Sequence, residues 1–231
     1  MVSAGMEAHV KHISRQDKIA TVVLTVIVGL VIAMLAAIVL YILVSGAGKL
    51  FDISFLTGKP QQFKAGGGIG PELFNSFYLL FLTLLISVPI SLGAAIFLSQ
   101  YAPDNWMTAA AKTAIETLSS LPSIVVGLFG FLFFVLYMGW GFSIIAGAVA
   151  LTMFNIPILV RVIQQALEDV PRSQRDAALA MGLTRWEATI HVLLPAAMPA
   201  IVTGVVLSAG RVFGEAAALI FTAGQSAPVL D

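Results

Sequence analysis

The stretch that decides the fold is PRSQRDAALAMGLTRWEATIHVLLP, residues 171–195, which is followed at once by an apolar segment carrying Arg211 and Glu215. The stretch is charged, whereas the segment after it is long enough to cross a membrane. A charge at the centre of a membrane span costs about 3 kcal/mol or more, so such residues are candidates for function. This juxtaposition predicts a membrane protein that moves a polar solute and is acted on from outside the membrane through the charged stretch.

The composition supports a location in lipid. Hydrophobic residues make up 59% of the 231 residues, charged residues only 10%, and the mean hydropathy is +0.98. No ordinary soluble domain is so poor in charge. The net charge is zero, which gives no indication of a nucleic-acid partner, and the absence of cysteine excludes disulfides and thiol chemistry.

Uncharged apolar runs predict five membrane-spanning helices. The first two are residues 19–44 and 73–98. Residues 117–160 are uncharged but too long for one crossing, so we expect them to fold back at Met138–Gly141 and to supply two spans. The fifth runs from about residue 195 to 223. The predicted fold class is an all-α integral membrane bundle with five transmembrane helices.

The distribution of Lys and Arg predicts the orientation of these spans. One side receives only Lys49, Lys59 and Lys64. The other side receives Lys11, Arg15, Lys18, Lys112, Arg161, Arg172, Arg175 and Arg185. We therefore expect the N-terminus and residues 171–195 to be cytoplasmic and Asp231 to lie outside.

Local signals in the charged stretch predict a helix over residues 173–181. Pro171 suits a helix start, and Ser173 and Asp176 have the spacing of a capping box. Gly182 is expected to end this helix in a left-handed conformation.

A second helix is expected directly after that glycine. Thr184 and Glu187 form another capping box. This helix should continue through Pro195 into the fifth span and join the charged stretch rigidly to the membrane. The plainer alternative is a solvated surface loop without a partner.

The fifth span, taken as one helix, places small and polar residues on a single stripe. These residues are spaced three or four apart, and their flanks are Val, Leu, Ile and Phe, which is typical of a pore-lining face. The stripe consists of Gly204, Ser208, Arg211, Glu215, Ala218 and Thr222. Its polar members, Ser208, Arg211, Glu215 and Thr222, are the candidate residues of a translocation path.

Arg211 has the chemistry to bind a tetrahedral oxyanion such as phosphate, because its planar guanidinium can donate two parallel hydrogen bonds. Glu215, one helical turn on, would neutralise it in the empty path and could accept a hydrogen bond from a protonated phosphate. We expect an intrahelical or intersubunit ion pair that opens as the anion passes. The alternative is a static pair that holds the fifth span to a partner.

Other small and polar residues in the spans are expected to serve packing. Gly127, Gly130 and Gly147 should allow close contact between helices, and Asn155 should bridge two of them.

Near the cytoplasmic end of the third span, Lys112 and Glu116 have the spacing of an ion pair.

Sites for catalysis and cofactors are not apparent in the sequence. No His, Asp or Glu cluster has the spacing of metal ligands, and no nucleophile is paired with a base. No stretch matches a phosphate-binding loop for ATP. We therefore expect no cofactor, no metal and no ATPase site on this chain.

The charged stretch resembles the EAA loop of ABC importer membrane subunits. Asp176-Ala177-Ala178, three residues, Gly182, nine residues and Val192-x-Leu194-Pro195 match E-A-A-x3-G-x9-I-x-L-P with Asp for Glu and Val for Ile. The resemblance implies a type I importer permease bundle, in which this loop is a coupling helix that docks on the ATP-binding subunit. The implied coupling residues are Asp176, Ala177, Ala178, Gly182, Leu194 and Pro195.

Further stretches are similar to the A-type, PstA-like permeases of phosphate-specific importers. They are LSSLPSIVVGLFGF (118–131), GGGIGPELFNSFYLL (66–80), FLSQYAP (97–103) and SAGRVFGEAAALIFTAG (208–224). The last is the most diagnostic, although Ala216 and Ala218 stand where Thr and Pro are common. Such chains continue with a sixth span, so we expect this chain to be a fragment, a truncated gene model or a natural variant.

The predicted spans, their orientation and the resemblance together divide the chain into four parts. They are a cytoplasmic segment (1–18), a transmembrane helix (19–44), an outer loop (45–72) and a permease core (73–227) that includes the cytoplasmic loop 166–194.

The implied function is the transport of inorganic phosphate across the cytoplasmic (inner) membrane of a prokaryote by an ATP-driven importer. The implied partners are two copies of an ATP-binding subunit, a second homologous PstC-like permease and an extracytoplasmic phosphate-binding protein. Three alternatives remain open: another oxyanion or small polar solute as cargo, a transporter or channel that needs no ATPase, and a remnant that does not transport.

Overall fold

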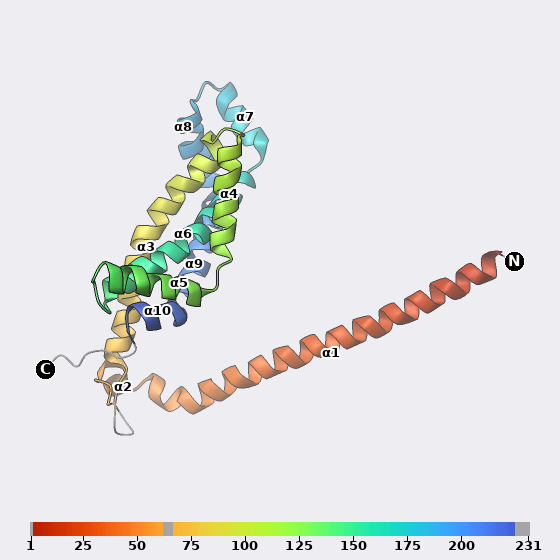
Figure 1. Ribbon diagram of the computed structural model, residues 1–231. Helices are drawn as coiled ribbons and strands as arrows, with labels where there is room; N and C mark the ends of the chain where they lie inside the picture. Colours follow the sequence, from red (N-terminus) through yellow and green to blue (C-terminus); the bar gives the residue numbers. More distant parts are fainter. Residues whose placement is uncertain (1, 62–66, 225–231) are drawn as a thin grey trace. The chain divides into compact units, whose positions relative to one another are not determined.

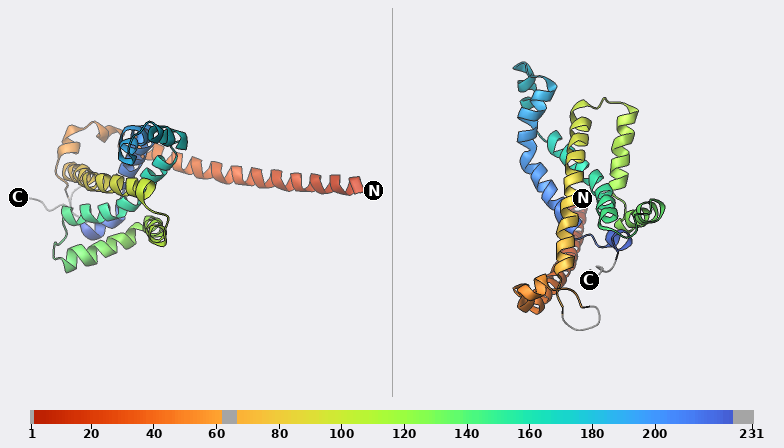
Figure 2. Two further views of the ribbon diagram at one scale, coloured as in Figure 1. Left: turned by 90° about the horizontal axis from the view of Figure 1, so that it is seen from above. Right: turned by 90° about the vertical axis from the view of Figure 1, so that its left-hand side faces the viewer.

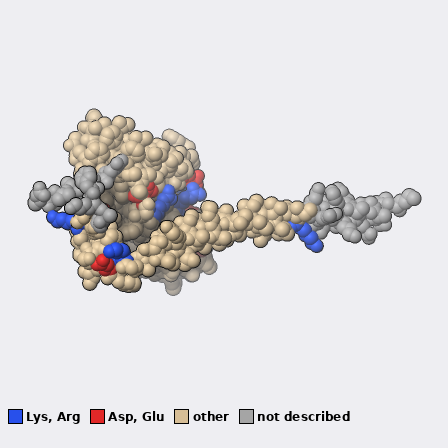
Figure 3. Space-filling view, turned by 90° about the horizontal axis from the view of Figure 1, so that it is seen from below, with Lys and Arg blue, Asp and Glu red and all other residues tan. Residues whose placement is uncertain are grey.

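The structure, a computed structural model, describes residues 2–61 and 67–224 (Figure 1). The chain divides into two compact units, Met1–Gly70 and Pro71–Asp231, and each is described by itself. Lys64 and Asp231, which entered the prediction of orientation, lie outside the described residues. Charged side chains are sparse on the molecular face in Figure 3, as expected for a chain with 10% charged residues.

The first unit begins with one long helix, α1 (Val2–Leu50), which contains the whole predicted first span. A second, short helix, α2 (Ile53–Thr57), starts at Asp52, whose carboxylate accepts hydrogen bonds from the backbone N–H groups of Ser54 and Phe55. The hydrogen bond from the Ser54 hydroxyl and that from the Phe55 N–H hold the pKa of Asp52 below its usual value. The carboxylate therefore remains ionised as the cap of α2 at neutral pH.

The second unit is built from helices, which Figure 2 shows in two further views. The first are α3 (Gly70–Ile96), its π-helical extension η1 (Phe97–Tyr101), α4 (Trp106–Ser119), α5 (Ser123–Gly130) and its π-helical extension η2 (Phe131–Tyr137). Then follow α6 (Ile144–Glu168), α7 (Arg172–Ala180), α8 (Arg185–Ala188), the π-helical turn η3 (Thr189–Leu193), α9 (Leu194–Phe213) and α10 (Ala217–Thr222).

The prediction of an all-α membrane protein is confirmed. Within residues 2–61 and 67–224, four helical segments are long and apolar enough to cross a membrane, and a bent pair adds a fifth crossing if it counts as one span. The four segments are Asp17–Lys49, Gly70–Tyr101, Ile144–Glu168 and Arg185–Phe213. The bent pair is Trp106–Ser119 with Ser123–Tyr137.

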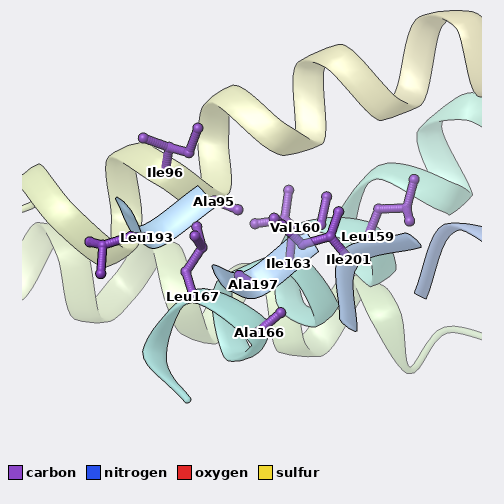
Figure 4. Close-up of a cluster of buried hydrophobic side chains, with 10 residues drawn as sticks. All are labelled: Ala95, Ile96, Leu159, Val160, Ile163, Ala166, Leu167, Leu193, Ala197 and Ile201. Carbon is purple, nitrogen blue, oxygen red and sulfur yellow. The ribbon is translucent and has the colours of Figure 1, made fainter. Parts of the chain in front are cut away.

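The core of the second unit lies where α3, α6 and α9 meet. Figure 4 shows the side chains of its main apolar cluster, to which α6 contributes the largest share. Lipid is as apolar as these side chains, so close packing rather than exclusion of water favours their contact. The cluster consists of Ala95, Ile96, Leu159, Val160, Ile163, Ala166, Leu167, Leu193, Ala197 and Ile201.

The predicted third span is not one straight helix. α4 and α5 meet at an angle of 97°. Pro122 stands at the bend in an extended conformation, and it has no N–H to continue the helix. α4 already begins at Trp106, capped by the side chain of Asn105, so Lys112 lies on a helix and not in a loop. The expected turn after this span is confirmed: Gly139 and Gly141 adopt φ of 70° and 63°.

The predicted fifth span is also not one helix. α9 ends at Phe213, and α10 begins only at Ala217 after a bend. The expectation of a continuous helix over residues 195–223, and with it the single polar stripe, is therefore wrong.

Glycines on α5 explain where α10 lies. A Cβ added to Gly127 would lie 2.8 Å from the Cα of Ala218, and one added to Gly130 would lie 2.8 Å from Cγ2 of Thr222. A Cβ added to Gly147 on α6 would lie 3.2 Å from the Cβ of Ala223. The prediction that these three glycines allow close helix contact is confirmed.

Candidate translocation and coupling sites

Arg211 lies in the last turn of α9, where the helix dipole favours a positive charge. Its side chain is exposed, and its Cζ atom stands 4.5 Å from the centroid of the Phe154 ring on α6. Among the described residues, Arg211 forms no ion pair and no hydrogen bond. Its N–H donors are therefore available to a ligand.

Glu215 lies beyond the end of α9 and does not pair with Arg211. Its Oε1 atom accepts a hydrogen bond from the backbone N–H of Ala218 at 3.4 Å, close to the start of α10. The bend after Phe213 removes the spacing of one helical turn on which the expected pair depended. The intrahelical form of that pair is therefore wrong.

Ser208 and Thr222, the other predicted path residues, are buried in helix contacts. The Ser208 hydroxyl donates to Oδ1 of Asn155, and Ser208 is only 5% exposed. The Thr222 hydroxyl donates to the backbone carbonyl of Ala218 at 2.9 Å, and its side chain packs against Gly130. Both hydroxyls are satisfied inside this chain, which favours a packing role for them.

Asn155 joins three helices, so the prediction that it bridges helices is confirmed. Its Nδ2 atom donates to Oγ of Ser87 on α3 at 3.0 Å, and its Oδ1 atom accepts from Ser208 on α9. Asn155 and Ser87 are fully buried. The sequence reasoning missed Ser87, although Thr83, Ser87 and Ser91 are spaced four apart, a periodicity that marks one polar face of α3.

The predicted pair of Lys112 with Glu116 is replaced by another. Glu116 on α4 pairs with Arg161 on α6 at 3.0 Å. Both side chains are more than half exposed. In water such a pair stabilises a fold by at most about 1 kcal/mol.

The first helix of the charged stretch ends as predicted. Gly182 has φ of 87°. Its N–H donates to the carbonyl of Leu179 at 3.0 Å, and the N–H of Leu183 donates to that of Ala178 at 3.2 Å. These two bonds form a Schellman motif. The capping box expected at Ser173 is wrong, because α7 begins directly after Pro171 without a side-chain cap.

The second helix of the stretch also begins as predicted. Thr184 and Glu187 form a complete capping box, with the Thr184 N–H donating to Oε2 of Glu187 at 2.8 Å. From Arg185 the chain stays helical to Phe213. This segment includes the π-helical turn η3, where the N–H of Leu194 bonds to the carbonyl of Thr189, five residues back, and Pro199 lies inside α9. The described helix is therefore one arm of roughly 40 Å from the surface stretch to Arg211.

The elbow, which we define as residues 171–195, lies at one end of the second unit. Figure 1 shows α7 and α8 at this end, and α5 and α10 at the other. A polar cavity of about 850 Å³ adjoins the elbow. Its charged lining residues are Asp104, Lys112, Glu168, Asp169, Arg172, Arg175 and Arg185.

The predicted coupling residues differ in exposure. Asp176, Ala177 and Gly182 are exposed, and so is Pro195 at the start of α9. Ala178 is completely buried. Leu194 is partly buried. Of the set, Ala178 alone has no surface on which another protein could make contact.

Residues 87–230 match the family model described as "Binding-protein-dependent transport system inner membrane component". The probable ABC transporter permease protein YqgI of Bacillus subtilis is 48% identical over 93% of this chain and 73% of its own length. The phosphate transport system permease protein PstA of Xylella fastidiosa is 36% identical over 73% of this chain and 58% of its own length. PstA 2 of Mycobacterium bovis is 37% identical over 79% of this chain and 60% of its own length.

The fold is similar to a solved importer. A structure of the inward-facing MetNI methionine ABC transporter has a TM-score of 0.53 and 23% identity, and it covers 64% of this chain and 68% of the other. The match supports the helical architecture, and the family model covers more than half of the chain. The chain therefore belongs to the binding-protein-dependent transport system inner membrane components, and it is a multi-pass permease subunit of an ABC importer.

Proposed function

We propose that this permease carries inorganic phosphate across the cytoplasmic membrane of a prokaryote. The observation that carries the proposal is Arg211, an exposed guanidinium on an apolar helix that has no ion pair in the part of the chain that the structure describes. The relatives named as PstA phosphate permeases, at 36% and 37% identity, support the same cargo.

The chemistry of Arg211 suits a tetrahedral oxyanion. A guanidinium donates two parallel hydrogen bonds to two oxygens of one anion, and a lysine ammonium cannot do this. Glu215 lies four residues on, and within the described chain its Oε2 atom accepts no hydrogen bond. This oxygen can accept a hydrogen bond from the O–H group of hydrogen phosphate. A fully ionised anion such as sulfate has no proton to donate and would meet repulsion instead.

The elbow is proposed to couple the permease to ATP hydrolysis by another protein. Two copies of an ATP-binding subunit would act on the complex, one of them through the exposed Asp176 and Ala177 on α7. The continuous helix from Arg185 to Phe213 supports this proposal, because a stiff arm transmits a displacement of the elbow to Arg211. A homologous PstC-like permease and an extracytoplasmic phosphate-binding protein complete the proposed importer.

The test uses the chain together with its partner subunits in a bacterial strain that lacks phosphate importers, with radiolabelled phosphate as the probe. Arg211→Gln should abolish uptake while the variant still inserts and co-purifies with its partners. Arg161→Gln is the matched control, because it removes a second helical arginine whose pair with Glu116 is exposed. Arg161→Gln should retain most of the uptake.

Competition with unlabelled anions tests the cargo. Arsenate, which is protonated and tetrahedral like phosphate, should reduce uptake, and sulfate should not. Normal uptake by Arg211→Gln would contradict the path assignment. Equal competition by sulfate would contradict the role of Glu215.

A further inference from the structure

We propose that Phe154 is a positioning residue for the anion site: its ring holds the guanidinium of Arg211 while leaving the N–H donors free for the transported anion. This inference rests on the proposed function, because it concerns how the same arginine is presented. It replaces the expected partner Glu215, whose carboxylate is engaged with α10.

The geometry of the contact supports this role. The Cζ atom of Arg211 is 4.5 Å from the ring centroid of Phe154, within the range of a cation–π interaction. The ring is only 3% exposed and is thus fixed by its surroundings. The guanidinium above it is exposed.

The ring differs chemically from a carboxylate in a way that matters for transport. A carboxylate would accept the N–H hydrogen bonds of the guanidinium, and an arriving anion would have to displace it. An aromatic ring attracts the cation through its quadrupole but has no lone pair to accept those bonds in the same way. Arg211 is therefore held in place with its donors unfilled.

The next residue on α6 fixes the helix that carries the arginine. Asn155 accepts the hydrogen bond of Ser208, which lies three residues before Arg211 on the same face of α9. Asn155 is in turn held by Ser87 on α3. Two consecutive residues of α6 thus set both the rotation of α9 and the position of its cation.

The test is a series of fluorinated phenylalanines at position 154, which weakens the ring quadrupole while it keeps nearly the same size. The apparent KM for phosphate uptake should rise stepwise with the number of fluorines, to about tenfold for the trifluorinated ring, while the maximal rate changes little. A ring that serves packing alone would leave the KM unchanged. The same series at Phe134, a buried ring that lines the same apolar cavity as Phe154 but has no cation near it, is the control.

A second measurement reports the contact without transport. The fluorine NMR resonance at position 154 should shift in the Arg211→Gln variant and remain in place in Arg161→Gln. An unmoved resonance, or a KM that is constant along the series, would overturn the role of Phe154. If Arg211→Gln abolishes uptake while the KM stays constant along the series, the proposed function stands and this inference alone fails. Normal uptake by Arg211→Gln would remove both.

Discussion

Two of the helix junctions in the second unit that contain a glycine, those at Gly182 and Gly214, are built in different ways. At Gly182 the chain takes φ of 87°, two backbone hydrogen bonds close the end of α7, and a capping box opens α8. At Gly214 the backbone has φ of −85° and ψ of 0°, which any residue can adopt. The residue at the N-cap of α10, Ala216, provides no side-chain hydrogen bond.

The two bends are determined by different kinds of contact. All the hydrogen bonds that shape the Gly182 junction come from residues within a few positions of it. The Gly214 junction depends on α5, because α10 can lie where it does only if Gly127 and Gly130 have no side chains. The first bend is encoded locally, and the second is encoded by tertiary packing.

The largest effect is expected from filling the space under α10. Gly127→Leu would place its Cβ 2.8 Å from the backbone of Ala218, which cannot move aside as a side chain could. Overpacking of this kind costs about 1–3 kcal/mol, and at a backbone contact we expect the upper part of this range. Thermal unfolding of the detergent-solubilised protein should show a clearly lower midpoint.

Gly93→Ala is the matched control for that change. Gly93 is on α3, and a Cβ added there meets no atom within 4 Å. Alanine should leave the midpoint unchanged or raise it slightly, because it favours the helix by about 1 kcal/mol over glycine. An equal loss of stability in Gly93→Ala and Gly127→Leu would contradict the tertiary origin of the second bend.

A smaller effect is expected at the first junction, from backbone conformation alone. Gly182→Ala meets no atom within 4 Å, but its positive φ should cost about 1–2 kcal/mol. The same change at Gly214 requires no unusual φ, and the nearest atom is at an ordinary 3.5 Å, so it should be nearly neutral.

Hydrogen exchange distinguishes these two alanine variants. Gly182→Ala should speed exchange of the amides of α7 and α8, and Gly214→Ala should leave the amides of α9 protected. Faster exchange in Gly214→Ala than in Gly182→Ala would contradict the conclusion that the first bend is encoded locally and the second by tertiary packing.

The smallest effect is expected from the cap of α8. Thr184→Ala removes the hydroxyl that accepts the N–H of Glu187, a loss of typically about 1 kcal/mol confined to one helix start. Exchange should accelerate at Glu187 and its helical neighbours. Thr203→Ala is the control, since the Thr203 hydroxyl bonds back to the carbonyl of Pro199 within the middle of α9 and caps nothing. If both substitutions have the same effect, the capping box does not stabilise the elbow.

The sequence predicted those parts of the molecule that local chemistry controls. The apolar runs located the spans, Gly182 located the end of α7, and the Thr184–Glu187 pair located the start of α8. Asn155 was expected to bridge helices, and an unpaired amide in lipid is costly. Each of these inferences needed only neighbouring residues or one general property of the bilayer.

The remaining features depend on contacts between segments far apart in the sequence. Pro122 indicates a bend but does not set its angle of 97°. Glu116 had a basic residue four positions earlier, yet its partner is Arg161 on another helix. Arg211 was expected to form an ion pair with Glu215 because the two residues are four positions apart. Only the packing of α6 against α9 brings the Phe154 ring to Arg211.

The π-helical turn η3 is a place where the chain can lose one residue without a change in the helix packing. A π-helical turn holds one residue more than an α-helical one, so losing a residue from Thr189–Leu193 would restore an ordinary turn and leave Ser208 aligned with Asn155. Losing a residue between 196 and 207 would instead rotate Ser208 by about 100° away from that partner. Homologues that are one residue shorter at this turn can therefore keep the same bundle, and a gap in their alignment belongs at η3 and not within α9.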